Sequence, residues 1–430
     1  MGGRRMTMRM RVPTPLLLAA LICLTMLAAA PAPAEQRADS VILFIGDGMG
    51  PGQVDLARQA ASGSPLEMER MPISGIVTTH SANQKVTDSA AAGTALATGR
   101  KTDNGMISVS PEGVRLETIL ERCQAARKSA GIITTDALHG ATPAAFAAHV
   151  SSRGQAAEIA KQMAHSRAQV MMGFWKNQFL PEAAGGSRKD GLDLIAQMRR
   201  AGYDVVFTKE ELAKARRPAL VGLFDDGEHA PTLAEMVRAA LSRLGADANG
   251  FFLMVEGARI DWFCHDNDPA GSVRDTWQFD QAVGVGLDYA RRRGRTLVVV
   301  TADHETGGLR LERPAKAHAL GAVKESSAEI ASHLNKDRSN TAQVMTEWAG
   351  ISDLTPEQVQ KIKTAEDPAG AVAAVLSERA GLSWSTKGHT ATPVRVFAFG
   401  PGSERFAGEM DNTDIPKRIA AALNLGAFPR

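Results

Sequence analysis

Short apolar stretches alternate with helix-like segments along the chain from residue 40 onward. Runs of about four to eight apolar residues, rich in branched side chains, indicate buried strands, whereas longer amphipathic segments indicate helices. Strands are predicted at 41–46, 131–135, 169–172, 204–207, 219–224, 251–255, 296–301 and 394–399, and helices at 89–98, 115–128, 231–244 and 272–292. This alternation predicts an α/β fold with a doubly wound, mostly parallel central sheet sandwiched between helices.

The pattern becomes charged and helical between residues 311 and 385. Thr355-Pro356-Glu357 is typical of a helix start, because threonine caps the first turn and proline fits the first helical position. We therefore predict a single domain over residues 35–430, in which residues 311–385 form a helical insertion.

The first 34 residues have the features of an export signal. Four arginines, at positions 4, 5, 9 and 11, precede an apolar run from Pro15 to Ala30, and Ala32-Pro33-Ala34 offers a small-residue cleavage site. The apolar run is short for a membrane span. We predict that residues 1–34 are a cleaved signal peptide and that the mature protein is periplasmic or secreted, with no membrane anchor.

The charges of the chain nearly cancel. Lysine and arginine total 49 and aspartate and glutamate total 47, so the formal net charge is +2. Removal of the four signal arginines leaves 45 basic against 47 acidic residues, a net charge of −2. Such a chain has no overall positive field to attract nucleic acid or an anionic membrane, so we expect no nucleic-acid-specific binding.

Three predicted strands end in side chains that commonly bind metals. In an open α/β sheet, ligands bind at the carboxyl ends of the strands, so these side chains can converge. Each one alone has an ordinary explanation as a turn or a cap, but their recurrence at three strand ends favours a shared site. Carboxylates and imidazoles suit Zn²⁺, and oxygen ligands suit Mg²⁺. The residues are Asp47 after 41–46, Glu256, Asp261 and His265 after 251–255, and Asp303 and His304 after 296–301.

A hydroxyl group stands at the start of the predicted alanine-rich helix 89–98, where Ser89 directly follows Asp88. The unpaired N–H groups of a helix start favour an anion such as phosphate. Serine is a weak nucleophile and needs activation by a base or a metal. Two metal ions could deprotonate Ser89 and stabilise the leaving oxygen of an in-line displacement. Ser89 is therefore the candidate nucleophile.

Taken together, these residues closely resemble the alkaline phosphatase family over most of the chain after residue 40. The resemblance is carried by the segments 85–105, 141–153, 255–261, 301–308 and 388–390, in that order. It implies hydrolysis of small phosphomonoesters to an alcohol and inorganic phosphate through a phosphoserine, used for phosphate scavenging outside the cytoplasm. Residues 35–430 would be the catalytic domain, with 311–385 as a lid or crown beside the active site, and the resemblance allows a homodimer.

The resemblance also implies two zinc ions and one magnesium ion. The ligands would be Asp261, His265 and His389 for the first zinc, Asp47, Asp303 and His304 with the reactive Ser89 for the second zinc, and Asp47, Thr142 and Glu256 for the magnesium. Arg153 would bind two phosphate oxygens, for which a planar guanidinium is suited. Asp88 would support Arg153 or the helix start.

Two positions depart from the family pattern. Gly140 stands where family members carry an acid or a histidine, with His139 beside it, and Trp262 stands where some members carry lysine or histidine. Groups that contact metal ligands tune metal affinity. We expect the third metal to be bound more loosely, or hydrated differently, than in other members.

Four other functions have weaker support in the sequence. A sulfatase would need a C-x-P-x-R type run, and residues 123–127 lack the proline. A related phosphodiesterase would more often present threonine as nucleophile. A zincin protease is excluded because residues 304–308 lack the second histidine. An exported phosphate- or metal-binding protein without turnover would be expected to lose the nucleophile or a zinc ligand, and the chain keeps both.

Overall fold

A computed structural model describes residues 1–7, 37–312 and 316–429. Most of the predicted signal peptide, from residue 8 on, lies outside the described residues. The chain from Arg37 onward forms one unit and carries all the elements discussed below. Within the described ranges, no helix combines the length and the hydropathy that a membrane span requires.

A ten-stranded sheet runs through this unit in the order β14-β2-β13-β8-β1-β7-β3-β4-β6-β5. All neighbouring pairs from β8 to β5 are parallel, and β13 alone runs antiparallel to both of its neighbours. The predicted α/β fold with a mostly parallel sheet is therefore confirmed. The strands are β1 Ser40–Gly46, β2 Ile73–Thr78, β3 Ser129–Ala137, β4 Val170–Phe174, β5 Asp204–Val206, β6 Leu220–Phe224, β7 Phe251–Gly257, β8 Thr296–Ala302, β13 Val394–Phe399 and β14 Gly408–Asp411.

Helices cover both faces of the sheet. Phe251 and Phe252 are successive residues of β7 and so point to opposite faces. The ring of Phe251 packs on Tyr289, with centroids 5.8 Å apart, and that of Phe252 stacks on Phe146, at 5.9 Å. The helices are α2 Pro51–Ala60, α3 Ser89–Thr98, α4 Ile119–Ala125, α5 Ala141–Ala147, α6 Ala156–His165, α7 Leu194–Arg200, α8 Lys209–Lys214, α9 Leu233–Leu244, α10 Arg259–His265, α11 Pro269–Arg293 and α16 Asp414–Ala422. Tyr289 belongs to α11 and Phe146 to α5, so these helices lie on opposite faces.

The central strands are buried along their whole length. Every residue of β1, β7 and β8 is buried, which explains why these strands read as continuous apolar runs rather than alternating ones. By contrast, β2 alternates between exposed and partly buried positions and lies near the sheet edge. The sequence pattern predicted the buried strands but not β2 or the short strand β14.

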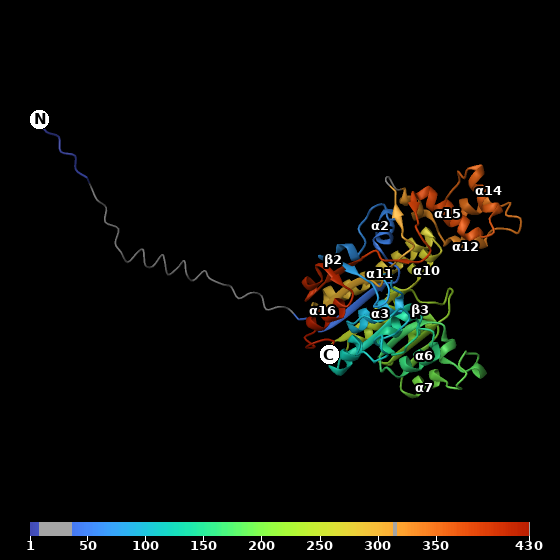
Figure 1. Ribbon diagram of the computed structural model, residues 1–430, viewed down its shortest axis with the longest axis horizontal. Coiled ribbons are helices and arrows are strands. Elements are labelled where there is room, and N and C mark those ends of the chain that lie inside the picture. Colours follow the sequence, from blue (N-terminus) through green and yellow to red (C-terminus); the bar gives the residue numbers. More distant parts are fainter. Residues whose placement is uncertain (8–36, 313–315, 430) are drawn as a thin grey trace. The chain divides into compact units, whose positions relative to one another are not determined.

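The segment between residues 311 and 385 carries a second apolar cluster. Its helices are α12 Ser327–Ser332, α13 Thr341–Ala349, α14 Pro356–Thr364 and α15 Pro368–Ala380, which Figure 1 shows together. Buried residues such as Ile330, Met345 and Val372 pack with Leu56 of α2 and Val273 of α11. The paired strands β10 (Arg310–Leu311) and β11 (Leu382–Ser383) close the base of the segment. Its role as a lid stays a prediction.

Truncation of a central strand residue is expected to destabilise the whole unit. Leu43 of β1 is completely buried, so Leu43→Ala should lower the free energy of unfolding by about 2–5 kcal/mol through lost burial and a residual cavity. Denaturant unfolding followed by circular dichroism measures this change. The control is Ile76→Ala in β2, where the residue is 47% exposed, and about 0.5 kcal/mol or less is expected. Equal losses in the two variants would contradict this description of the core.

Candidate active site

Three adjacent parallel strands deliver acidic side chains to one edge of the sheet. In the strand register, Gly46 of β1 lies level with Gly257 of β7 and with Ala302 of β8. Asp47 and Asp303 are the next residues along their strands. They therefore leave the sheet at its carboxyl edge, where open α/β sheets bind ligands.

A glycine turn after β1 allows α10 to approach closely. Gly48 has a φ of +72°, in the left-handed region that favours glycine. A Cβ on Gly48 would lie 2.7 Å from the Cα of Asp261. The backbone N–H of Gly48 also donates to Oδ1 of Asp303, at 3.2 Å. The turn thus helps to hold Asp47, Asp261 and Asp303 together.

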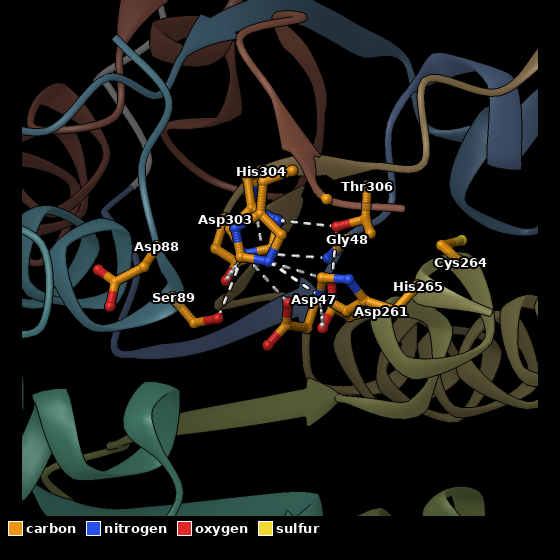
Figure 2. A network of polar contacts seen from close by, with 12 residues as sticks. Asp47, Gly48, Asp88, Ser89, Asp261, Cys264, His265, Asp303, His304 and Thr306 are labelled. Atoms are coloured by element: carbon orange, nitrogen blue, oxygen red, sulfur yellow. Dashed lines mark hydrogen bonds and ion pairs between the residues drawn. The ribbon is translucent and has the colours of Figure 1, made fainter. Parts of the chain in front are cut away.

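One group of buried ligand-type atoms consists of Asp47, Asp303 and His304, which offer atoms within 4.8 Å of one another. Nε2 of His304 lies 3.4 Å from Oδ1 of Asp47 and 3.3 Å from Oδ2 of Asp303. These two carboxylate oxygens are buried and form no hydrogen bond. Figure 2 shows the carboxylates arranged around the imidazole of His304. Two acidic oxygens and one imidazole nitrogen therefore face a common point.

A second group lies on the other side of His304. Asp261, His304 and His389 offer ligand atoms within 4.8 Å of one another. His265 joins them, because its Nε2 lies 3.3 Å from Oδ2 of Asp261 and 3.2 Å from Nε2 of His389. Thr306 donates from Oγ1 to Oδ1 of Asp261, at 2.5 Å, and so fixes that carboxylate. The structure thus brings together the three residues predicted for the first zinc.

Each of these imidazoles has a partner at Nδ1 and directs Nε2 into the cluster. Histidines that bind metals commonly have the other ring nitrogen fixed in this way. The Nδ1 partners are the carbonyl oxygen of Lys387 for His265 at 2.5 Å, the carbonyl oxygen of Thr87 for His389 at 2.9 Å, and Oγ1 of Thr306 for His304 at 3.3 Å. The ring orientations are therefore set by the surrounding protein.

Ser89 reaches the same cluster from the start of α3. Its Oγ lies 3.2 Å from Nε2 of His304, and its side chain is buried. The helix that carries it is buried along its whole length and consists mostly of small residues. A Cβ on Gly93 would lie 3.1 Å from that of Ala145 in α5. Small side chains thus let α3 pack closely on α5, which fixes the position of Ser89.

Asp88 links the start of this helix to Arg153. Its Oδ1 accepts the N–H of Ala91, at 2.9 Å, and its Oδ2 accepts the N–H of Gly105, at 3.0 Å. Nη1 of Arg153 lies 3.3 Å from Oδ2, and the arginine side chain is 45% exposed. Asp88 therefore contacts both the helix start and Arg153, the two groups that it was predicted to support. The guanidinium is left open to solvent beside the buried cluster, where it can meet an incoming anion.

A third group of oxygen atoms lies where β7 and α5 meet. Oε2 of Glu256 accepts a hydrogen bond from Oγ1 of Thr134. The hydroxyl of Thr142 is buried without a hydrogen bond, although it lies near enough to Glu256 to lower the pKa of that carboxyl. Burial and then the charge of Asp136 nevertheless raise the pKa of Glu256 to about 8. Glu256 and Thr142 therefore offer oxygens to a cation.

Burial and mutual repulsion dominate the electrostatics of the carboxylates. Burial, followed by the charge of Asp303, raises the pKa of Asp47 well above its usual range. Burial, followed by the charge of Asp261, raises the pKa of Asp303 to about 7. Buried carboxylates that repel one another and have unpaired oxygens are costly without a counter-charge. The residues present therefore fit divalent cations bound by oxygen and nitrogen atoms.

The histidines differ in charge. Burial lowers the pKa of His304 to about 4. Burial also lowers the pKa of His389, and repulsion from His304 in its protonated form lowers it further. Both rings are therefore neutral at pH 7, the form that binds metals. The hydrogen bond with Asp261 raises the pKa of His265 to about 9. For Asp261, burial favours the neutral form, but the bond to His265 and the charge of His304 prevail and lower its pKa to about 2.

The structure also places residues whose roles the sequence left open. The indole of Trp262 stacks on that of Trp175, with centroids 5.7 Å and planes 6° apart, and Arg259 lies over the Trp262 ring. The ring of His139 packs edge-on against Phe179, with centroids 6.3 Å apart. Both residues therefore have packing partners.

Sequence reasoning missed Thr306 and Asp136. Thr306 contacts Asp261 and His304, and its position two residues after His304 was the only available signal. Asp136 is the last residue but one of β3, which pairs with the strand that carries Glu256, whereas the sequence pattern predicted that the strand ends at residue 135.

The two cysteines in the described ranges are free and buried. Burial raises the pKa of both Cys123 and Cys264 to about 12. A buried thiol with a raised pKa is a poor nucleophile and a poor source of thiolate. These properties favour neither Cys123 as the nucleophile of a sulfatase nor Cys264, the neighbour of His265, as a metal ligand.

Comparison with known proteins identifies similar chains along almost the full length. A family model described as alkaline phosphatase matches residues 38–425. The chain is 33% identical to alkaline phosphatase 4 of Bacillus subtilis, covering 90% of this chain and 89% of that protein, and 30% identical to alkaline phosphatase of Escherichia coli, covering 91% and 87%.

Solved structures agree with these sequence matches. A cold-active alkaline phosphatase from Shewanella sp. has a TM-score of 0.82 and 32% identity, covering 89% of this chain and 99% of that chain. Alkaline phosphatase of Thermus thermophilus has a TM-score of 0.81 and 29% identity, covering 91% of this chain and 93% of that chain. A variant of TAB5 alkaline phosphatase, described with Mg bound in a site called M3, has a TM-score of 0.68 and 28% identity. The match covers 91% of this chain and 99% of that chain.

The raised carboxylate pKa values predict how the chelated protein responds to pH. Asp303, Glu256 and His265, with pKa values of about 7, 8 and 9, retain protons in the folded state that the unfolded chain releases. Stability should therefore fall as pH rises from about 6.5 to about 8, because the folded state loses protons and gains repulsion. Below about 6.5 the neutral His304 opposes this trend, since the unfolded chain then binds more protons at that ring.

Urea unfolding at pH 6.5 and pH 8, with and without added Zn²⁺, measures this dependence. We expect chelated protein to be less stable at pH 8, and zinc to raise stability most at pH 8. Equal stability of the chelated protein at the two pH values would contradict the description of repelling carboxylates.

Proposed function

The chain belongs to the alkaline phosphatase family, and from this premise we propose that it hydrolyses phosphomonoesters in two displacements with Ser89 as nucleophile. Phosphomonoester hydrolysis is the activity of the family. The observation that carries the assignment of Ser89 is the position of its Oγ, 3.2 Å from Nε2 of His304, at the start of a buried helix. His304 belongs to both groups of ligand-type residues, so Ser89 stands where the two groups meet.

Metal ions are the proposed cofactors, two zinc and one magnesium. When bound, they would neutralise the buried carboxylates, favour ionisation of the serine hydroxyl and stabilise charge on the leaving oxygen. The proposed residues are Asp261, His265 and His389 for one zinc, Asp47, Asp303, His304 and Ser89 for the other, and Asp47, Thr142 and Glu256 for magnesium. Support comes from the unpaired oxygens of Asp47, Asp303 and Thr142, and from the magnesium described for the TAB5 relative.

In the first displacement, Oγ of Ser89 attacks phosphorus, the bond to the alcohol oxygen breaks, and the alcohol leaves with a proton. A phosphoserine remains. In the second displacement, water attacks the phosphoserine, the bond between phosphorus and Oγ breaks, and inorganic phosphate leaves. Ser89 regains its proton, so each cycle consumes one water molecule.

Two features of the chain would hold the phosphoryl group during both steps. Arg153 offers a planar pair of N–H donors to two oxygens, and Asp88 holds its side chain beside Ser89. The start of α3 adds the partial positive charge of its first turn. Both features address the phosphoryl group rather than the alcohol, so broad alcohol specificity is expected.

The proposed catalytic domain spans residues 35–430, with 311–385 as a lid or crown beside the site. The chain just beyond this insertion contacts the cluster. The carbonyl oxygen of Lys387, two residues beyond the insertion, accepts a hydrogen bond from His265. Within the insertion, the ring of Trp384 lies 2.5 Å from the position that a Cβ on Gly307 would occupy. A shift of the insertion would therefore reach the ligands of the first zinc.

The proposed setting is outside the cytoplasm, in the periplasm or the medium, where the enzyme would scavenge phosphate without a membrane anchor. The features of residues 1–34 support export. A homodimer is proposed on the family resemblance alone, and its mass in solution tests it.

Replacement of the nucleophile should abolish turnover without emptying the metal sites. Ser89→Ala removes the only side-chain atom that bonds to phosphorus in the proposed mechanism, so turnover should fall by about three orders of magnitude or more. Release of phosphate from an aryl phosphate measures turnover, and elemental analysis measures zinc. Ser242→Ala is the control, because among the described residues that hydroxyl forms hydrogen bonds only within its own helix, α9. Near-normal activity of Ser89→Ala would show that another nucleophile acts.

Loss of one imidazole should cost one zinc ion. His389→Ala removes an Nε2 that faces Asp261 and His265, so zinc per chain should fall from two toward one while the far-ultraviolet spectrum is retained. His165→Ala is the control, since that side chain is exposed and, in the described part of the chain, hydrogen-bonds only to the carbonyl oxygen of Lys161 in its own helix. Unchanged zinc content in His389→Ala would refute the ligand assignment.

Export should remove the first 34 residues. When the full chain is expressed in a bacterial host, we expect activity in the periplasmic or medium fraction, and N-terminal sequencing should give Glu35 as the first residue. A cytoplasmic enzyme that retains Met1 would contradict the proposed signal peptide.

A further inference from the structure

Asp136 fills the space that a side chain at position 140 would otherwise occupy. A Cβ on Gly140 would lie 2.8 Å from Oδ2 of Asp136 and 2.9 Å from the carbonyl oxygen of Ala137. The backbone of Gly140 has a φ of −59° and a ψ of 165°, which residues other than glycine also adopt. The carboxylate of Asp136 and the carbonyl oxygen of Ala137 leave no room for a side chain at position 140. This lack of space, rather than the backbone conformation, explains why the residue is glycine.

The carboxylate of Asp136 lies close enough to Glu256 for its charge to raise the pKa of that carboxyl. Thr134 is level with Glu256 across the pair β3–β7. Oγ1 of Thr134 donates to Glu256 and accepts the N–H of Asp136, at 2.9 Å. Oδ1 of Asp136 accepts the N–H of Ala137, at 2.5 Å, and this bond fixes the side chain beside the start of α5. One threonine thus ties the two acidic residues together.

An unpaired buried oxygen points to a ligand at this place. Oγ1 of Thr142, on the first turn of α5, is buried without a hydrogen bond. Thr142, Glu256 and Asp47 are the residues proposed for magnesium. Magnesium requires six oxygens and keeps several waters, whose hydrogens need acceptors in the surrounding protein.

We propose that Asp136 is the carboxylate that accepts hydrogen bonds from the water shell of the third metal ion, in place of the side chain that position 140 lacks. The inference rests on the proposed magnesium site and makes Asp136 a positioning residue. His139 cannot supply this negative charge. Its ring packs on Phe179, and burial lowers its pKa to about 4, so it is neutral.

Titration of the zinc-loaded enzyme with MgCl₂ in a calorimeter tests the proposal. Asp136→Asn keeps the shape of the side chain and removes its charge, so magnesium should bind about 10–100-fold more weakly while zinc content stays the same. The matched control is Asp280→Asn. Asp280 is a buried carboxylate that accepts from the backbone of Glu67 and Met68, outside the site. The control should lose stability and keep its magnesium affinity.

A relocated carboxylate provides a second test. Asp136→Gly should weaken magnesium binding as Asp136→Asn does, and addition of Gly140→Asp should restore part of the affinity, because a side chain at 140 projects to the same place. Circular dichroism checks folding, since Ala137 must shift slightly. If the double variant does not fold, the comparison of Asp136→Asn with wild type decides alone.

The possible failures are distinguishable. If the wild-type enzyme binds no magnesium, the proposed third site is wrong. If wild type binds magnesium and Asp136→Asn binds it within twofold, the third site stands and the role of Asp136 is wrong. If Asp136→Asn changes only the inhibition constant of inorganic phosphate, Asp136 acts on Arg153 instead, and the proposal is also wrong.

Discussion

Repulsion among buried carboxylates at the ends of β1, β7 and β8 is the constraint on which the rest of the site depends. Asp47, Glu256 and Asp303 leave water when the sheet forms, and one oxygen each of Asp47 and Asp303 is left without a hydrogen bond. An isolated arrangement of this kind is unfavourable, so it persists only because many apolar residues fix the strands. Divalent cations convert the same arrangement into a favourable one. The repulsion that destabilises the folded chain without metal is therefore also the source of its affinity for metal.

Rigid supports keep the ligands from relaxing apart. The central strands are wholly buried, and a turn that favours glycine holds α10 against β1. Thr306, Thr134 and backbone carbonyl groups fix the carboxylates and the imidazoles from outside. Ser89 is placed by a helix of small residues that packs closely on α5. The reactive hydroxyl is thus held in position by packing before any substrate arrives.

Much of the fold could be predicted from the sequence, because fully buried parallel strands leave a strong apolar signal. The predicted strand 394–399 and helix 89–98 coincide with β13 and α3. Strand β2, next to the edge strand β14, was missed because one of its faces is solvated. The helix predicted at 115–128 is shorter, since Thr118 and Glu121 form a capping box that starts α4 at Ile119.

The candidate site was only partly predictable for a related reason. Residues at strand ends can be found one strand at a time, but contacts between neighbouring strands cannot. Thr134 and Asp136 act on Glu256 across the β3–β7 pair, and nothing in their own segment signals that contact. The most direct measurement of the central claim is an anomalous difference map at the zinc edge from a crystal of the metal-loaded enzyme. The account predicts two peaks, one bound by Nε2 of His304 and one by Nε2 of His389. Peaks located away from these atoms would contradict it.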